Sequence, residues 1–254
     1  MKLGNRDIKA FAVAPFQKQH YVAALGMFRT YKHPLDAYAR YLFGIGRYPI
    51  TVTLDTPIGD IELMLYTPHD ILTVNEIFCR QDYKAKPNDK VIVDFGSNIG
   101  ISAAYFLSRT LQSYAYLYEP FPQNITRLKS NLRRFEGRYC LSEVAVGLGN
   151  GPVEFGYEET GRYGGVGLKT GAYISVECLD SNEALKQVLA KNERISILKI
   201  DIETLEKHVT GRIPVETLSR IDKIYVESRF TVNPLEKTHS YRQYGSVAQF
   251  SIKS

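Results

Sequence analysis

The stretch Val91-Ile-Val-Asp-Phe-Gly-Ser-Asn-Ile-Gly100 decides the fold class of this chain. Its first residues are mostly apolar, which is typical of a short strand buried on both faces of a parallel sheet. Gly96 and Gly100 let the backbone turn sharply and approach a ligand without an intervening Cβ. A helix is predicted over residues 101–111, and its first turn offers unpaired backbone N–H groups. The stretch therefore predicts a strand, a ligand-binding turn and a helix.

The same alternation of strand and helix continues along the chain. Further strands are predicted at residues 114–118, 141–146, 195–201 and 221–227, and further helices at residues 122–135 and 181–191. Residues 153–157 and 173–177, with glycine-rich turns near them, are predicted to be antiparallel strands. Alternation of this kind implies a mainly parallel sheet with helices on both faces. We therefore predict an α/β fold with a Rossmann-like sheet over residues 86–254.

Residues 1–85 have a different pattern and are predicted to form a cap of helices and one hairpin. The hairpin is indicated by period-two alternation of apolar side chains, and an apolar stripe through Tyr21, Leu25 and Phe28 indicates a helix. The other elements predicted here are hairpin strands at residues 50–54 and 61–65 and helices at residues 35–43 and 70–83. Such a cap would exclude water and select a substrate, or it would form a homodimer interface.

The composition is that of an ordinary globular protein of 254 residues, with 44% apolar and 23% charged residues. The net charge is only +5, and the most basic segment, residues 127–138, is interpreted as a solvated helix face or a contact for an acidic substrate. We therefore expect no nucleic-acid partner.

The chain has three cysteines that lie far apart in the sequence, Cys79, Cys140 and Cys178, and this pattern suits a reducing compartment. Because the sequence shows no signal peptide and no apolar run of membrane length, the expected location is the cytoplasm.

The glycine spacing distinguishes between nucleotide cofactors. Asn98 stands where a dinucleotide site needs a second glycine to admit a pyrophosphate. S-adenosylmethionine (SAM) has no phosphate and carries a cationic sulfonium, which suits the carboxylate of Asp94. Glu119 follows the second strand, 19 residues after Gly100, where a carboxylate can accept hydrogen bonds from both ribose hydroxyls. Together these signals favour SAM, although a helix-capping Glu119 in a flavodoxin-like domain is an alternative.

The predicted SAM contacts come from several segments of the chain. Adenine is expected near the exit of the third strand, where Ala145 lies, and Tyr83 is expected to cover the cofactor from the preceding segment. The full predicted set is Glu76, Tyr83, Asp94, Phe95, Gly96, Ser97, Asn98, Gly100, Ile101, Glu119, Pro120, Ala145 and Asp201.

Several short motifs between about residues 50 and 230 occur in an order that is specific as a set. They are residues 70–78 with Asp82-Tyr83, residues 93–100, Tyr118-Glu119-Pro120 with Asn124, residues 143–147, Val176-Glu-Cys-Leu-Asp180, and Ile197-Leu-Lys-Ile-Asp201-Ile-Glu203. Together they resemble the FkbM-type family of class I SAM-dependent methyltransferases. The resemblance implies O-methylation, frequently of sugar hydroxyls or secondary metabolites. The chain departs from the family at Thr204, where a glycine is usual, and in the short tail after Glu227.

Carboxylates at the ends of the fourth and fifth strands supply the chemistry expected for methyl transfer to a hydroxyl. Asp201 ends the fourth strand and Glu227 the fifth, at the edge of the sheet where ligands bind in such folds. Asp201 is predicted to be a general base, with Glu227 as a helper. A second interpretation, which we do not favour, is that Asp201, Glu203 and Glu227 hold Mg²⁺.

Two histidines are further candidates for the base. His208 lies in the helix predicted after Asp201. His239 is preferred because Tyr241 and Arg242 crowd it in a tail that is expected to form a binding loop for a polar ligand.

Three functions are compatible with these patterns. The leading one is O-methylation of a small molecule, sugar or glycan. An RNA methyltransferase would share the fold, but no RNA-binding module and no Asn-Pro-Pro-Tyr-like motif occurs in the sequence. A non-catalytic nucleotide-binding domain would bind its ligand without turnover.

Overall fold

The computed structural model describes residues 2–3, 6–7, 25–161 and 163–253. The chain divides into two compact units, Met1–Lys84 and Ala85–Ser254, and this division lies one residue from the boundary expected at residue 85. Each unit is described by itself.

The first unit contains the predicted hairpin and short helices. Its elements are β1 (Lys2–Leu3), β2 (Arg6–Asp7), α3 (Pro34–Phe43), β3 (Ile50–Leu54), β4 (Ile61–Leu65), α4 (Asp70–Val74) and the π-helix η2 (Asn75–Cys79). The hairpin bounds match the prediction, because every second side chain of β4 is buried, and the strands pair with Ile50 opposite Leu65. The helix predicted to reach residue 83 ends at Cys79, where a π-turn closes it. Residues 25–30 are helical, and Tyr21 of the predicted stripe lies outside the described residues.

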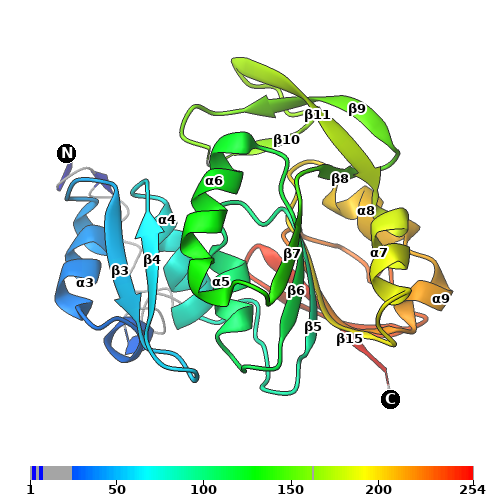
Figure 1. Ribbon diagram of the computed structural model, residues 1–254, viewed down its shortest axis with the longest axis horizontal. Helices are drawn as coiled ribbons and strands as arrows, with labels where there is room; N and C mark the ends of the chain where they lie inside the picture. The colour runs from blue at the N-terminus through cyan, green and yellow to red at the C-terminus, as the bar shows by residue number, and fades with distance from the viewer. Residues whose placement is uncertain (1, 4–5, 8–24, 162, 254) are drawn as a thin grey trace. The chain divides into compact units, whose positions relative to one another are not determined.

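The second unit is built on a seven-stranded sheet in the order β14-β15-β13-β12-β5-β6-β7 (Figure 1). These strands are β5 (Val91–Phe95), β6 (Tyr114–Tyr118), β7 (Tyr139–Ser142), β12 (Ile195–Ile200), β13 (Ile221–Val226), β14 (His239–Tyr244) and β15 (Val247–Ile252). The five strands from β7 to β13 run parallel, and β15 pairs antiparallel with β13. This sheet confirms the predicted Rossmann-like fold class.

The direction of strand succession reverses between β5 and β12. From β5 the chain moves outward through β6 to β7, and it then returns to place β12 on the other side of β5. In open α/β sheets the ligand crevice lies at such a switch point, at the carboxyl ends of the strands. The carboxyl ends of β5 and β12 therefore mark where a site is expected.

Helices cover both faces of this sheet. They are α5 (Ile101–Leu107), α6 (Pro122–Asn131) with the 3-10 turn η3 (Arg133–Phe135), α7 (Ser181–Leu189), α8 (Glu206–Arg212) and α9 (Val215–Leu218). Figure 1 shows α5 and α6 on one side of the sheet and α7 on the other. The helices α5, α6 and α7 begin where predicted and end two to four residues earlier. The core on the α7 side joins Leu185 and Val188 to Val93 and Leu198 of the central strands.

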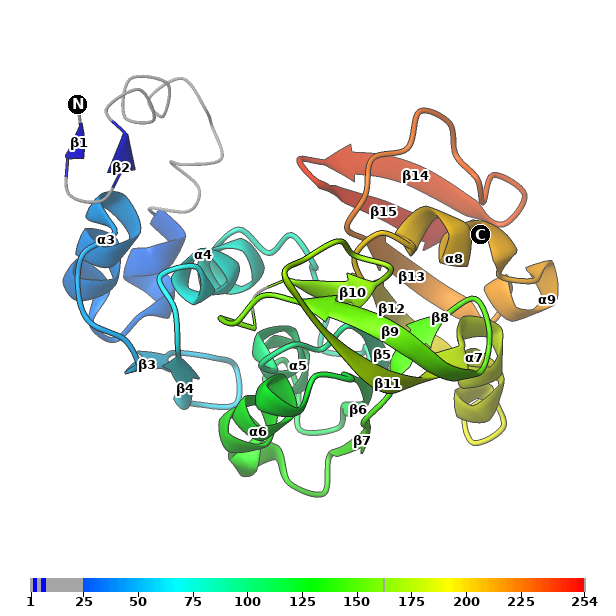
Figure 2. The same ribbon diagram turned by 90° about the horizontal axis from the view of Figure 1, so that it is seen from above.

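A second sheet of four strands corrects the prediction for residues 141–146. Its strands are β8 (Ala145–Gly147), β9 (Gly151–Tyr157), β10 (Gly164–Val166) and β11 (Ala172–Asp180), in the order β10-β9-β11-β8. The predicted third strand is split, because the chain leaves the main sheet after Ser142 and β8 pairs with β11 instead. The break is at Glu143, an exposed residue that binds Lys129 of α6 at 2.6 Å. The antiparallel pair predicted at residues 153–157 and 173–177 is confirmed as β9 and β11 (Figure 2).

Candidate functional site

The glycine turn after β5 is held tightly against the end of β12. Gly96 has φ +80°, and a Cβ added there would lie 1.8 Å from the carbonyl oxygen of Asp201. Gly100 has φ +86° and begins α5. The backbone N–H groups of Gly96 and Ser97 donate to the Tyr118 carbonyl at 3.1 and 3.0 Å. Only glycine fits at position 96, because a side chain would collide with the backbone that carries Asp201.

Two predicted contacts in this stretch have their side chains in the core. Phe95 is fully buried and meets the Tyr118 ring edge-on at 5.1 Å, and Ile101 is 4% exposed. Either residue would therefore meet a ligand only through its backbone.

The carboxylate of Asp94 is completely buried at the carboxyl end of β5. It accepts hydrogen bonds from Ser102 Oγ at 2.5 Å and from Lys199 Nζ at 3.0 Å. Burial raises the pKa of Asp94, while the charge of Lys199 and the Ser102 hydroxyl act in the opposite direction. Ser102 was not among the predicted site residues.

The ammonium group of Lys199 lies between the two acidic residues of the switch point. Lys199 is 2% exposed, and its Nζ is 3.0 Å from Asp94, 3.2 Å from Asp201 and 2.9 Å from the Gly96 carbonyl. Burial lowers the pKa of Lys199, but the attraction of Asp201 and Asp94 is larger in sum and raises it above its ordinary value. The lysine is therefore charged. The Asp201 side chain is 27% exposed, so its carboxylate also reaches the surface of the site.

Glu119, which follows β6, is joined directly to the glycine turn. Its two carboxylate oxygens accept hydrogen bonds from the backbone N–H groups of Asn98 and Phe121, each at 2.9 Å. The residue is 5% exposed, and burial raises the pKa of its carboxyl to about 7, against the opposing effect of these N–H groups. The Asn124 side chain is a third hydrogen-bond partner of this carboxylate, so about one of its four lone-pair sites remains for a ligand's hydroxyl.

An aromatic pair lies next to this carboxylate. The rings of Phe121 and Tyr157 are 4.7 Å apart and inclined by 32°. Phe121 follows Pro120 directly, so the pair borders the Glu119 end of the site. Ala145, the predicted adenine contact, is 3% exposed and pairs with Cys178 in the second sheet rather than ending the third main-sheet strand. Neither aromatic residue was predicted, although Phe121 is next to the Glu119-Pro120 motif.

The turn after Asp201 is strained and tied to the second sheet. Glu203 and Thr204 have φ +54° and +70°, where glycine is favoured over a β-branched residue such as threonine. The Thr204 hydroxyl donates to the Val166 carbonyl at 3.0 Å. A Cβ at Gly165 would lie 2.8 Å from the Cβ of Glu203, so β10 lies directly against this turn. Position 204 is therefore held by a threonine whose side chain bonds to β10.

Glu206 is a further carboxylate near Asp201 that sequence reasoning missed. It is 8% exposed at the start of α8. Burial raises its pKa, the nearby charge of Asp201 adds to this effect, and backbone N–H groups of the preceding turn oppose it.

Glu227 lies at the same edge of the sheet as Asp201. Its backbone N–H donates to the Ile200 carbonyl at 3.0 Å, and its side chain is exposed. His208 is exposed on α8. The assignment of these two residues as helper and base remains a prediction.

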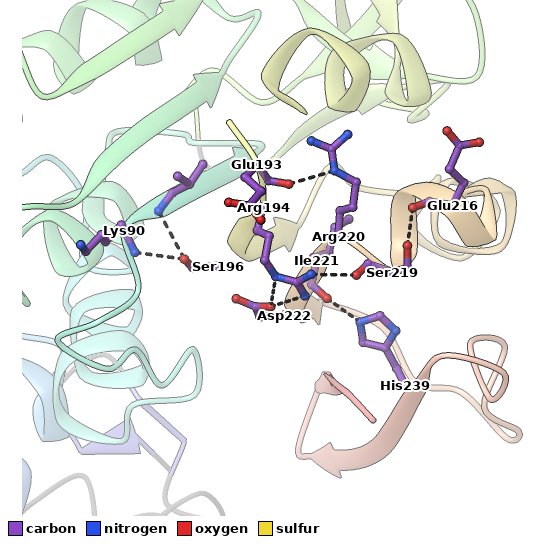
Figure 3. Close-up of polar contacts among 11 residues, drawn as sticks. Lys90, Glu193, Arg194, Ser196, Glu216, Ser219, Arg220, Ile221, Asp222 and His239 are labelled. Carbon is purple, nitrogen blue, oxygen red and sulfur yellow. Dashed lines mark hydrogen bonds and ion pairs between the residues drawn. The ribbon is translucent and has the colours of Figure 1, made fainter. Parts of the chain in front are cut away.

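His239 does not lie in a binding loop, and that expectation is wrong. It begins strand β14 and is fully buried. Its Nε2 is 3.0 Å from the carbonyl of Ile221, the first residue of β13, and its Nδ1 is 2.9 Å from Thr238 Oγ1. Figure 3 shows His239 pointing to Ile221, near the Arg194–Asp222 ion pair. Because Ile221 begins β13, His239 lies at the amino ends of the parallel strands, whereas Asp201 follows the carboxyl end of β12. Burial lowers the pKa of His239, so the neutral ring serves as a structural partner.

The alternative magnesium set does not assemble. Within residues 25–161 and 163–253, the side chains of His, Cys, Asp and Glu form no group of three that could hold a metal ion. The Asp201 carboxylate instead has the Lys199 ammonium as its partner at 3.2 Å.

Two predicted cofactor contacts belong to the first unit. Glu76 is exposed in η2 with its carboxylate 3.7 Å from Arg80, and Tyr83 is 4% exposed. Their roles remain predictions. Among the described residues, no helix combines the length and apolar character needed to cross a bilayer.

Comparison with known proteins gives weak similarities. No protein-family model matches the chain. AMB antimetabolite synthetase AmbE of Pseudomonas aeruginosa is 25% identical over 159 residues, which cover 61% of this chain and 7% of that protein. The chain thus spans a small fraction of this curated relative.

Similar solved structures include several methyltransferases. A putative caffeoyl-CoA O-methyltransferase from Staphylococcus aureus has 14% identity and a TM-score of 0.38, with 72% of this chain and 81% of that chain covered. An rRNA methylase from Streptococcus thermophilus has 8% identity and a TM-score of 0.38, covering 73% and 96%. Trm5b from Pyrococcus abyssi has 10% identity and a TM-score of 0.40, covering 82% and 56%. The strand order of the sheet, rather than these similarities, defines the fold class.

Proposed function

We propose that the chain is a methyltransferase of the FkbM type that binds SAM at the Gly96–Gly100 turn and methylates a hydroxyl of a sugar, glycan or secondary metabolite. The observation that carries the proposal is the bond between the Glu119 carboxylate and the Asn98 N–H, at 2.9 Å. This bond holds the carboxylate that would bind the ribose of a nucleoside beside the glycine turn. The turn lacks the glycine spacing of dinucleotide sites. The acidic residues Asp94 and Asp201 lie at the same switch point, where the sulfonium would be bound.

The residues present fit SAM. Glycine at position 96 lets the turn pack directly against the Asp201 backbone, which brings the Asp201 carboxylate to the same switch point as the turn. Glu119 retains about one lone-pair site for a ribose hydroxyl. The Phe121–Tyr157 pair offers an apolar aromatic surface for adenine, in place of Ala145.

Asp201 is the group best placed to act on the acceptor. Bound SAM would supply an electrophilic methyl carbon with a neutral thioether as the leaving group. The Asp201 carboxylate, 27% exposed, accepts the hydroxyl proton and later releases it to water. Most of the rate enhancement would come from alignment of the acceptor with the methyl carbon.

The first unit would act as a cap that selects the acceptor, or as a homodimer surface. The three cysteines are free, which fits a reducing compartment such as the cytoplasm.

Two experiments test this function. Isothermal titration with SAM and with NAD tests the cofactor, and absence of SAM binding would reject the proposal. Transfer of a radiolabelled methyl group to sugars, glycosylated metabolites and RNA then tests the acceptor class. Labelled RNA with unlabelled sugars would replace the proposed acceptor by a nucleic acid, and SAM binding without any transfer would indicate a binding domain.

A further inference from the structure

The carboxylate that would bind the ribose is almost closed off in this structure. Glu119 is only 5% exposed, and its hydrogen-bond partners include the backbone N–H groups of Asn98 and Phe121 and the side chain of Asn124. Asn98 and Phe121 belong to the turns that lead into α5 and α6, whereas Asn124 also holds a separate element. A ribose that binds Glu119 therefore requires an element beside this carboxylate to move.

The separate element is the hairpin of β9 and β10, residues 151–161 and 163–166. The Asn124 side-chain amide donates to the Gly161 carbonyl at 2.9 Å, and Arg127 Nη1 donates to the Thr160 carbonyl at 2.7 Å. Both donors lie on α6. One end of the hairpin is therefore held beside the Glu119 end of the site.

The strand β10 of the hairpin is held beside Asp201. The Thr204 hydroxyl donates to the Val166 carbonyl at 3.0 Å, and a Cβ at Gly165 would lie 2.8 Å from the Cβ of Glu203. The hairpin thus reaches from α6 to the turn after β12. Figures 1 and 2 show β9 and β10 lying across the carboxyl ends of the main strands, where the cofactor site is proposed.

The bonds that hold the hairpin closed are individually weak. Those from Arg127 and Thr204 lie at the surface, where water competes for both partners. Closure also has a cost, because Asn124 Oδ1 is buried and, among the residues that the structure describes, has no hydrogen-bond partner. Opening the hairpin would let water reach this oxygen. Since β9 pairs with β11 along its whole length, the hairpin can swing together with β11 and keep its strands paired.

We propose that the β9–β10 hairpin is a gate that opens to admit SAM and closes over its ribose, a role that rests on the proposed function. The closed hairpin places Tyr157 against Phe121, so the aromatic surface proposed for adenine is complete only in the closed form. The rate of SAM entry is then set by the fraction of molecules in which the hairpin is open, and the bound cofactor leaves through the same opening.

The test measures the association and dissociation rate constants of SAM for the immobilised full chain by surface plasmon resonance. Thr204→Val removes the hydroxyl that bonds to β10 and keeps a branched side chain, and Arg127→Met removes the bond to the Thr160 carbonyl. Each change should raise both rate constants about fivefold, and the double variant roughly 25-fold, which is the shift in the closed–open equilibrium expected for each lost hydrogen bond. The dissociation constant should change less than about threefold, because the bond is lost equally from the free and the bound closed forms.

A matched variant separates the hydrogen bond from the shape of the side chain. Thr204→Ser keeps the hydroxyl and should therefore keep the wild-type rate constants. Circular dichroism confirms that folded proteins are compared. Arg127→Met tests the hairpin independently if Thr204→Val does not fold, because the Arg127 bond is on the surface of α6.

The outcomes separate the gate from the proposed function. If the wild-type chain binds no SAM, the proposed function fails and the gate fails with it. If the wild-type chain binds SAM and the variants keep its association rate constant, the hairpin is a fixed wall and the inference is overturned. Faster dissociation with unchanged association would also overturn it, because a gate controls entry as well as exit.

Discussion

Replacing Glu119 by glutamine should remove a pH dependence of stability that has an unusual sign. The folded protein raises the pKa of this carboxyl from 4.5 to about 7, chiefly by burial. Below pH 4.5 the group is protonated in both states and has no effect. As the pH rises to 7, the unfolded state releases the proton first, so Glu119 lowers the free energy of unfolding progressively, by up to about 3 kcal/mol, and the loss is complete above pH 7. Most paired carboxylates have the opposite effect.

Urea unfolding of the wild-type chain and Glu119→Gln between pH 5 and 8 measures this contribution. The free energy of unfolding of the variant relative to wild type should increase by about 2.5 kcal/mol over that range, since part of the effect is already present at pH 5. The amide can accept only one of the two N–H bonds from Asn98 and Phe121, so a constant loss of about 1–3 kcal/mol is superimposed at all pH values. Glu119→Asp is not a suitable control, because it would shift both bonds. A stability difference that does not vary with pH would refute the reasoning that burial controls this carboxyl.

Four further predictions concern the site and its scaffold. SAM affinity should rise with pH up to about 7 and then level off, because the ribose hydroxyls need the ionised Glu119, and titrations of Glu119→Gln should show no such rise. Asp201→Asn should lower turnover by about 100- to 10,000-fold but SAM affinity by no more than about tenfold, and the reverse order would make Asp201 a cofactor ligand. Gly96→Ala should destabilise the fold by at least about 2 kcal/mol, since its φ is +80° and its Cβ would meet the Asp201 carbonyl; a smaller loss in urea unfolding would contradict the close packing. His239→Ala should lower stability by about 2–3 kcal/mol and leave methyl transfer per folded molecule unchanged, whereas loss of transfer would restore His239 as a candidate base.

The fold was predictable where local pattern determines structure. The strands around residues 50–65 were placed to the residue because period-two alternation marks which side chains face inward. The apolar run before Gly96 and the helix after it also came from local chemistry. Helix ends were less accurate, since the last turns of α5 and α6 depend on tertiary packing rather than on a glycine or proline signal.

The features that were missed depend on contacts between distant parts of the chain. Lys199 lies 105 residues from Asp94, and neither residue by itself indicates the pairing. The split of the third strand depends on β11, which draws β8 into the second sheet. His239 was misplaced because its aromatic neighbours suggested a ligand loop, whereas β15 pairs with those residues as a strand. Register across a sheet and buried charge pairing are non-local, so the sequence motif alone does not reveal them.

The central claim is that the switch point between β5 and β12 holds SAM, and direct titration tests it. Isothermal titration of the full chain at pH 8 should show one SAM site, no NAD binding, and a clear loss of SAM affinity in Glu119→Ala. The absence of SAM binding, or NAD binding that depends on Glu119, would contradict the account.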